Sequence, residues 1–310
     1  MEWTQVEERI VEDDRNKWDR KAAAAKLRIS TSSGVLDVGN ADRAPDRYSL
    51  SELATTQMCQ RLGIPVPYYR RLPDQLRAMI ANHDFDRLGD SAFLLRGKNE
   101  WVRAFLSSDY VTYNNSHVAE TVKALLDGGP VSVRSFVLEE THLFLKIISD
   151  EIVDRDSGLK AGVMIGNSEV GTASISIEPF VYRLTCTNDL VVSKEQSFRH
   201  SHTRLTVDEL RKGTALAISI AFKVASSALD QFLKTREELV PDPVETIRQL
   251  AEARKLSRKF ADEVASSYAV EPEPTRFGVI NAFTRAAQKL GPLQRIEIER
   301  FAGTLIEAKL

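Results

Sequence analysis

Three arginines lie at the centre of segments whose alternation of apolar and polar residues predicts β-strands. Arg103, Arg134 and Arg183 therefore stand where an interior strand usually carries an aliphatic side chain. A structural explanation for Arg183 is an ion pair with Glu169 or Glu178, because a partly buried guanidinium requires a carboxylate. A functional explanation is that the three arginines line one sheet face and bind phosphate, for which the planar guanidinium offers paired donors.

Two further segments interleave aromatic and basic side chains. PVPYYRRLP, residues 65–73, sets two tyrosines beside two arginines. GKNEWVRAFLSSDY, residues 97–110, contains Lys98, Trp101 and Tyr110 around the first of the three arginines. Single-stranded nucleic acid is bound by aromatic platforms beside cations, so both segments are candidates for such a surface. The alternative is that the rings belong to the core, as aromatic residues in hairpins often do.

The glycines of the segment GNSEVG offer a different kind of anion site. Gly166, Asn167 and Gly171 can form a loop whose backbone N–H groups accept an anion, or simply a bulged turn. No lysine follows these glycines and no helix is predicted after them, which excludes a Walker A loop and a dinucleotide fingerprint.

The histidines do not form a recognisable metal site. His200 and His202 are two residues apart and share a face on a strand, and His142 stands beside two glutamates. Neither group has four ligands at a zinc spacing, so no metal is predicted. With Arg199 and Arg204 on either side, the first pair fits a basic loop equally well.

Composition sets limits on these candidates. The 310 residues carry 42 basic and 44 acidic side chains, a formal net charge of -2, so a polyanion site would have to be local. Cys59 and Cys186 are too few for a disulfide framework, and neither Cys186 nor Ser168 lies in a nucleophile motif. Residues 1–21 contain no apolar leader, and no apolar run approaches a membrane span in length. We expect a cytoplasmic protein without catalytic residues or cofactor.

The hydrophobic patterns predict an α+β protein. Residues 1–44 are expected to form an N-terminal helix and a short hairpin, and residues 45–205 an α+β core with a mainly antiparallel sheet flanked by helices. Residues 206–310 are expected to be all-helical, starting from a capping box of Thr206 and Glu209.

Several local predictions follow for the first part of the chain. A surface helix is expected over residues 5–27, and the hairpin after it should turn at residues 33–34. Pro65 and Pro67 should keep a linker extended, and Pro73 should begin a helix.

Within the predicted core, hairpins should turn at residues 97–99 and 139–141. Pro179 places its strand at a sheet edge or a bulge, and residues 188–189 should turn the chain.

Five segments together resemble a known family. LGIPVPYYRRLP, VRAFLSSDY, GNSEVGTASISIEPFVYRLTCTNDLVV, RHSH and TRFGVINAFTRAA resemble, in that order, the phage/plasmid-like proteins grouped as domain of unknown function 932. The resemblance covers roughly residues 45–300. One departure is Asp189, where the family favours glycine, although aspartate also tolerates a turn.

The resemblance implies a mobile-element setting, in which DNA-handling factors are common. We therefore expect an oligomeric protein that binds single-stranded DNA and takes part in annealing or recombination. The expected contact residues are Lys98, Trp101, Arg103, Tyr110, Arg134, Arg183, Arg199 and His200.

Two alternatives stay open. One is an enzyme or small-molecule binder built around Asn167, Glu169, Arg183 and His200, which requires these side chains to meet in a cleft. The other is a protein-interaction factor, such as a host-defence inhibitor, that uses the C-terminal helices and exposes an apolar patch there.

Overall fold

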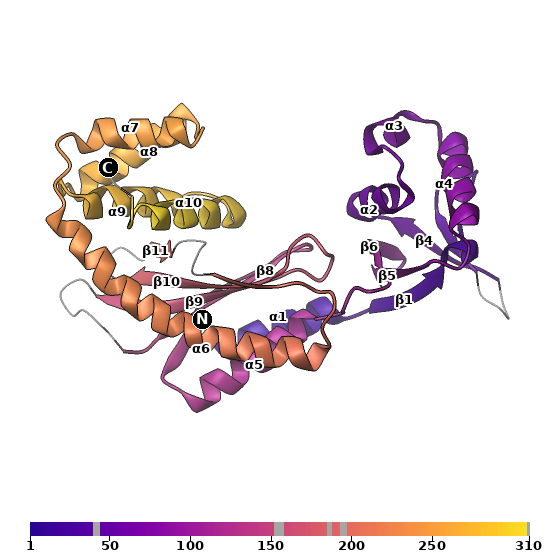
Figure 1. Cartoon of the computed structure of the whole chain (residues 1–310), viewed down its shortest axis with the longest axis horizontal. Coiled ribbons are helices and arrows are strands. Elements are labelled where there is room, and N and C mark those ends of the chain that lie inside the picture. Colours follow the sequence, from indigo (N-terminus) through magenta and orange to yellow (C-terminus); the bar gives the residue numbers. More distant parts are fainter. Residues whose placement is uncertain (40–43, 152–157, 185–187, 193–196, 309–310) are drawn as a thin grey trace.

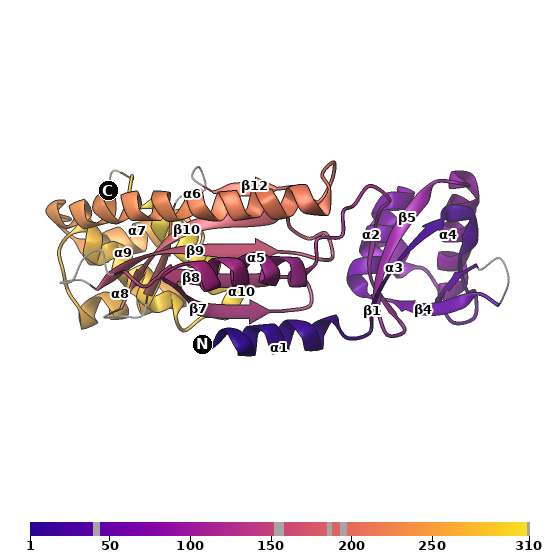
Figure 2. The same ribbon diagram turned by 90° about the horizontal axis from the view of Figure 1, so that it is seen from below.

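Two β-sheets organise the chain (Figures 1 and 2). The computed structural model describes residues 1–39, 44–151, 158–184, 188–192 and 197–308. The strands are β1 (Lys17–Ala23), β2 (Leu27–Ile29), β3 (Leu36–Val38), β4 (Asp46–Leu50), β5 (Ala92–Lys98), β6 (Trp101–Ser107), β7 (Val131–Leu138), β8 (Leu143–Ser149), β9 (Leu159–Asn167), β10 (Ile175–Arg183), β11 (Asn188–Val191) and β12 (Phe198–His200).

The helices surround the two sheets and also form the end of the chain. They are α1 (Trp3–Asp14), α2 (Glu52–Leu62), α3 (Val66–Arg71), α4 (Asp74–Leu88), α5 (Asn115–Gly128), α6 (Val207–Lys234), α7 (Pro243–Ala253), α8 (Arg258–Val270), α9 (Arg276–Ala287) and α10 (Pro292–Thr304). Short 3-10 turns are η1 (Ala24–Lys26) and η3 (Thr235–Glu237). The predicted α+β class with a helical C-terminal region is confirmed.

The first sheet forms an N-terminal lobe, residues 17–107, with the strand order β1-β5-β6-β4-β3-β2. Its pairings are antiparallel except for β4 with β6. Helix α2 packs against β6 and α4 against β2. Leu27, Phe85 and Phe105 are fully buried in the core between the sheet and these helices.

The second sheet has the order β11-β10-β9-β8-β7, and β12 also pairs with β10. Helices α1, α5 and α6 lie along one face, and α10 crosses the other at the end where α7, α8 and α9 gather (Figure 1). Leu145 and Val163 are buried under the first group of helices. On the opposite face, Met164 and Phe180 pack against Ile296 of α10. The strands of the predicted core are thus divided between two sheets.

Several turns and one helix cap predicted from the sequence are confirmed. The hairpin of β5 and β6 turns with Asn99 at φ 52°, and the hairpin of β2 and β3 turns with Gly34 at φ 67°. Strands β7 and β8 are joined at residues 139–142. Thr206 and Glu209 form the capping box that begins α6. The residues that favour these conformations do so without help from distant parts of the chain.

Two N-terminal predictions are wrong. The helix expected over residues 5–27 ends at Asp14, and Asn16, with φ 64°, redirects the chain into β1. All seven residues of β1 pair with β5, and this ladder outweighs the weak helix preference of the alanines. The expected extended linker contains the short helix α3, in which Pro67 occupies the first turn.

Pro179 is also placed differently from the prediction. It lies in β10, which has β9 on one side and both β11 and β12 on the other. The carbonyl of Pro179 accepts a hydrogen bond of 2.8 Å from the Val192 N–H. Since the N and the O of a strand residue point to the same side, the missing N–H of the proline lies in the gap between β12 and β11. An interior strand can therefore contain this proline.

The turn expected at residues 188–189 is absent from the described structure, since both residues belong to β11. Asp189 is completely buried and bonds Lys146 Nζ and Arg295 Nη2, both at 2.8 Å. The charge of the Asp189 carboxylate balances these two cations. Cys186, expected in the same strand as Tyr182, lies outside the described residues.

The expectation that no apolar run approaches a membrane span in length is corrected by helix α6. Together with η3 it spans residues 207–237 and is, within the described ranges, the one helix long and apolar enough to cross a membrane. In the structure it lies along the second sheet, where Leu210, Ala217 and Ile218 are fully or almost fully buried. This packing accounts for part of the apolar composition of α6, since 39% of its most apolar stretch is buried.

Gly303 tests how closely α10 is packed on β11. A Cβ built at this residue lies 1.7 Å from the Val191 carbonyl oxygen, so Gly303→Ala must push the helix away from the strand. We expect Gly303→Ala to lower the free energy of unfolding by about 3 kcal/mol or more. Gly128→Ala in α5, where a Cβ meets nothing within 4 Å, is the control. Equal stability of the two variants in urea unfolding would contradict the packing described here.

Candidate functional site

The three arginines do not share a sheet face. Arg103 lies in β6 of the first sheet, whereas Arg134 and Arg183 lie in β7 and β10 of the second. Arg134 stacks 4.5 Å from the ring centroid of Tyr182, the neighbour of Arg183 in β10. Because neighbouring strand residues point to opposite faces, Arg134 and Arg183 lie on opposite sides of the sheet. The prediction that the three arginines line one sheet face is wrong.

Arg183 forms an ion pair, as its structural explanation required, but with a different partner. Its Nη2 and Nη1 bond the two carboxylate oxygens of Glu271 at 2.6 and 3.1 Å, and its guanidinium stacks on Phe277. Glu271 directly follows α8. Glu169 and Glu178 bond other cations, so their predicted pairing with Arg183 is wrong. No pattern in the sequence shows that α8 returns to this strand.

The segment after β9 is a junction between the two sheets and not an anion loop. The Glu169 carboxylate accepts hydrogen bonds from Lys17 Nζ at 2.7 Å and from the Asn115 N–H at 2.8 Å, and Arg103 Nη1 lies at 3.5 Å. Arg96 Nη1 donates to the Glu169 carbonyl at 2.8 Å. Lys17, Arg96 and Arg103 belong to the first sheet, and Glu169 follows the second. We call this group the interlobe junction.

Apolar contacts complete the junction. Val170 is fully buried against Leu94, Ala104 and Leu106 of the first sheet. The Val170 carbonyl accepts a hydrogen bond of 2.8 Å from Gln57 in α2. The residues NSEVG therefore attach the second sheet to the N-terminal lobe through both charge and packing.

The carboxylates of the junction surround an ammonium group. Oxygens of Asp13, Asp14 and Glu169 lie within 4.8 Å of one another, and Lys17 Nζ contacts them at 2.6, 2.8 and 2.7 Å. Burial alone would raise the pKa of the Glu169 carboxyl, but the charge and hydrogen bond of Lys17, with the Asn115 N–H, lower it below its usual value. The cluster thus encloses its own cation.

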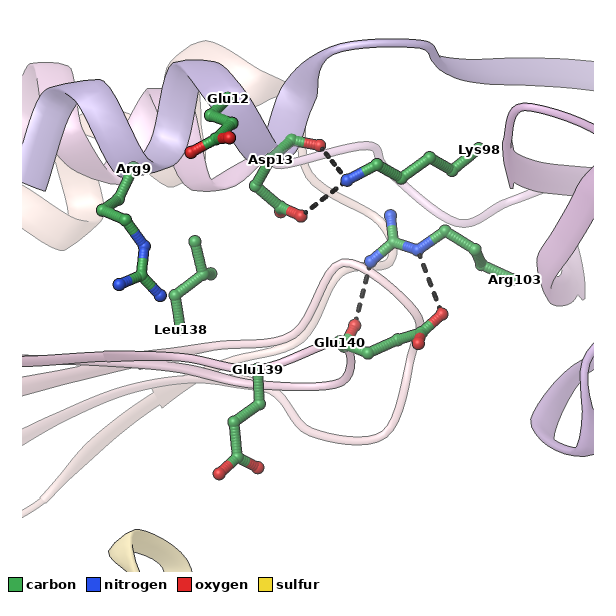
Figure 3. Close-up of a pocket in the computed structure, with 8 residues that line it drawn as sticks. All are labelled: Arg9, Glu12, Asp13, Lys98, Arg103, Leu138, Glu139 and Glu140. Atoms are coloured by element: carbon green, nitrogen blue, oxygen red, sulfur yellow. Dashed lines mark hydrogen bonds and ion pairs between the residues drawn. The ribbon is translucent and has the colours of Figure 1, made fainter.

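A cavity of about 390 Å³ adjoins the junction (Figure 3). Lys98 and Arg103, two of the expected contact residues, extend into it between α1 and the turn from β7 to β8. Lys98 Nζ bonds Asp13, and Arg103 donates to the Glu140 carbonyl at 2.9 Å. Each expected cation already has an acidic or carbonyl partner, and the lining mixes both signs of charge.

A second cavity, of about 530 Å³, brings together the two aromatic and basic segments of the sequence. Trp101 lines it with 49% of its surface exposed, together with residues of α3 and α4 that include Tyr69, Arg70 and Arg77. Arg70 pairs with Glu52 at 2.7 Å, and Arg77 stacks on Tyr69. The cavity thus contains an exposed ring and two guanidinium groups.

Of the remaining expected contacts, Tyr110 and His200 are half-buried and Arg199 is exposed. The Tyr110 hydroxyl donates to the Ser168 carbonyl at 2.8 Å, and its ring stacks on His202 at 4.9 Å between centroids. Tyr110 therefore packs against the core of the interlobe junction. His200 is half-buried close to Gly213 of α6, while Arg199 beside it is exposed.

The alternative site of Asn167, Glu169, Arg183 and His200 does not exist in the structure. Asn167 bonds the Tyr113 carbonyl and Asn115 next to the junction. Arg183 pairs with Glu271 at the far end of β10, and His200 faces α6. Because the four side chains diverge, this prediction is wrong.

A third cavity, of about 350 Å³, lies on the second sheet beside α10. Its lining includes Arg199, His142, Ser176 and Arg300. Of these four, Arg199 alone was among the expected contact residues. They are brought together by the pairing of β12 with β10 and by the docking of α10, neither of which has a signal in the sequence.

The protein is thus an α+β protein whose two sheets are joined by buried ion pairs. Two of its surface cavities contain cations, one together with an exposed aromatic ring and the other together with hydroxyl groups and an imidazole. The chain belongs to the family described as a domain of unknown function (DUF932), whose family model matches residues 102–303. This confirms the family resemblance. Neither the curated proteins nor the solved structures contain a match to this chain.

Glu169→Gln tests the junction. The neutral amide keeps the shape of the side chain. It removes the negative charge that Lys17 and Arg103 both face in this buried site. We expect the free energy of unfolding to fall by about 3 kcal/mol or more, as when one partner of a buried pair is removed. Glu140→Gln, whose side chain is 69% exposed, should change it by about 0.5 kcal/mol at most. A Glu169→Gln variant as stable as the control would show that the junction does not hold the lobes.

His202 should make stability depend on pH. Burial lowers the pKa of its imidazole from the usual 6.5 to about 4. The unfolded chain therefore binds the proton first, so stability is complete above about pH 6.5 and declines by about 2–3 kcal/mol as the pH falls to 4. His202→Phe, which keeps a ring against Tyr110, should flatten this part of the curve. The exposed His83→Gln should retain the wild-type slope, and an unchanged slope in His202→Phe would contradict the assignment.

Proposed function

We propose that this protein binds single-stranded nucleic acid, with Trp101 as the stacking platform. The observation that carries the proposal is the cavity of the N-terminal lobe, which is lined by the exposed indole together with Arg70 and Arg77. A base stacked on an aromatic side chain contributes about 1–3 kcal/mol, and the flanking cations can contact its phosphates. The cavity volume of about 530 Å³ is in the range that accepts a small ligand.

The ion pairs around the cavity are compatible with this role. Arg70 and Glu52 form their pair with both side chains more than half exposed, and Arg77 pairs with the exposed Asp74. Exposed pairs contribute only about 0–1 kcal/mol, so a phosphate can compete for the guanidinium groups. Arg71 and the exposed ring of Tyr68 extend the surface along α3.

Because the chain is nearly neutral and few arginines line the cavity, we expect salt to lower the affinity only moderately. If the arginines neutralise two or three phosphates, the logarithm of affinity should fall against that of salt with a slope of about -1.5 to -2 for a single strand. Moderate affinity at low salt is therefore the expected behaviour.

The proposal extends to a role in annealing or recombination of DNA, in keeping with the phage and plasmid setting of the resemblance. Such a role would use a homo-oligomer, in which several N-terminal lobes present their platforms to one strand. Acceleration of annealing between complementary strands is the activity to measure.

Protein interaction through the C-terminal helices is the second candidate function. Leu216 and Ile220 are exposed one turn apart on α6, which is the observation that favours it. Loss of self-association in Leu216→Glu, with strand binding unchanged, would support this candidate.

The test is fluorescence anisotropy with a labelled single strand and its duplex at low and moderate salt. We expect the single strand to be preferred, and Trp101→Ala to weaken its binding by about 1–3 kcal/mol, or roughly fivefold to 150-fold. Met79→Ala, which removes another exposed apolar side chain of the same lobe, is the matched control.

Two results would overturn the proposal: no binding by the wild-type protein at low salt, or equal binding by Trp101→Ala and the wild type. Arg183→Ala should lower stability through loss of its pair with Glu271 and leave the binding of the folded fraction unchanged.

A further inference from the structure

The cavity on the second sheet differs from the other two polar cavities in its charge. The described residues of its lining contribute two guanidinium groups, one imidazole and several hydroxyl groups, but no carboxylate. In the junction cavity and in the Trp101 cavity, acidic side chains line the same space as the cations. An anion entering the cavity on the second sheet would therefore meet donors without a competing carboxylate in the wall.

The floor of this cavity is a row of residues across four strands. Arg199 of β12 pairs with Ser176 of β10, which pairs with Gly166 of β9, which pairs with Phe144 of β8. Directly paired residues point to the same face, so the four positions form one surface. A Cβ at Gly166 would lie 2.5 Å from Ser176 Oγ, so the glycine leaves room for that hydroxyl.

The wall beside α10 is a guanidinium held in a fixed orientation. Arg300 donates from Nε at 2.7 Å and from Nη2 to the two oxygens of the buried Glu178. This bidentate pair leaves Nη1 outside the contact with Glu178, and Arg300 lines the cavity. Its orientation therefore does not have to be acquired when a ligand binds.

The opposite wall is formed by His142 and the residues after the junction. The imidazole stacks on Phe144 with an interplanar angle of 5°, and its Nδ1 lies 2.8 Å from Thr141 Oγ1. Its Nε2 lies 3.4 Å from Thr172 Oγ1, at the rim of the cavity. These contacts present a ring nitrogen and a hydroxyl toward the same space.

Arg199 is the cation whose charge is not offset locally. It is exposed, and across the described ranges it forms no ion pair with a carboxylate. Among the described residues that line the cavity, Arg300 is balanced by Glu178, and Arg199 adds one positive charge. Hydrogen bonds between a guanidinium and an anionic oxygen are among the strongest in proteins, and their planar geometry matches phosphate.

We propose that this cavity is a binding site for a phosphate group, with Arg199 as the principal ligand and Arg300 and the Ser176 hydroxyl as further donors. The site is separate from the Trp101 cavity and does not depend on its function. The phosphate can belong to a small molecule, such as a mononucleotide, or to a nucleic-acid strand, since the same donors recognise both.

Calorimetric titration with three probes separates these sources. The probes are inorganic phosphate, a deoxynucleoside monophosphate and a short single-stranded oligonucleotide with a 5′-phosphate. We expect Arg199→Gln to weaken the binding of at least one probe by about tenfold or more, the usual effect of losing a charge-assisted contact. Arg47→Gln, which removes an exposed arginine of the N-terminal lobe, should bind every probe like the wild type.

The pattern across probes identifies the ligand. Phosphate or mononucleotide binding that is lost in Arg199→Gln and retained in Trp101→Ala supports a small-molecule site. Oligonucleotide binding that Arg199→Gln reduces, without binding of the two small probes, supports contact with a strand phosphate.

The proposal is overturned if none of the three probes binds at about 10 mM phosphate groups, an affinity weaker than that of most specific sites. It is also overturned if a folded Arg199→Gln binds all probes like the wild type. Ser176→Ala, a smaller change in the floor, should weaken binding less than Arg199→Gln does, and the reverse order would remove Arg199 as the principal ligand.

Discussion

The buried carboxylate of Glu169 is the contact on which the arrangement of the two sheets depends. It accepts bonds from Lys17 of β1 and from the first backbone N–H of α5, and it lies near Arg103 of β6. A charge so deeply buried is tolerated only when its lone pairs are bonded and its charge is balanced. The start of a helix adds a favourable dipole to that balance. Because Glu169 follows β9 of the second sheet while Lys17 and Arg103 belong to the first, these bonds hold the lobes in one orientation.

A second ionic group anchors the C-terminal helices. Lys146 bonds Asp189 and Glu299 at 2.8 and 2.6 Å, and Arg295 of α10 bonds the same two acids. Lys146, Asp189 and Glu299 are almost completely buried. Loss of any one would leave an unbalanced charge in the interior, so the geometry of these contacts specifies where α10 lies. The matched family region contains this group completely, whereas Lys17 and Arg96 of the junction precede it.

These networks restrict where ligands can be bound. The interior arginines of the strands are engaged by carboxylates or by aromatic rings, so they stabilise the fold. The two proposed binding sites lie at the surface, in the Trp101 cavity and in the cavity around Arg199. One has an exposed ring for stacking and the other has uncompensated charge, which are complementary requirements for recognising nucleotides.

The amino-acid sequence by itself determined the α+β class, the hairpins of β2–β3, β5–β6 and β7–β8, the cap of Thr206, and the need of Arg183 for an acidic partner, because each depends on neighbouring residues or on the cost of a buried charge. Tertiary structure decided the rest. Strand parity cannot show that Arg103 and Arg134 belong to different sheets, and nothing local to Arg183 points to Glu271, 88 residues away. Likewise, Arg199 and Arg300 meet only because β12 and α10 converge on β10. Such contacts depend on the pairing and docking of elements far apart in the chain, and the local pattern of residues contains no record of them.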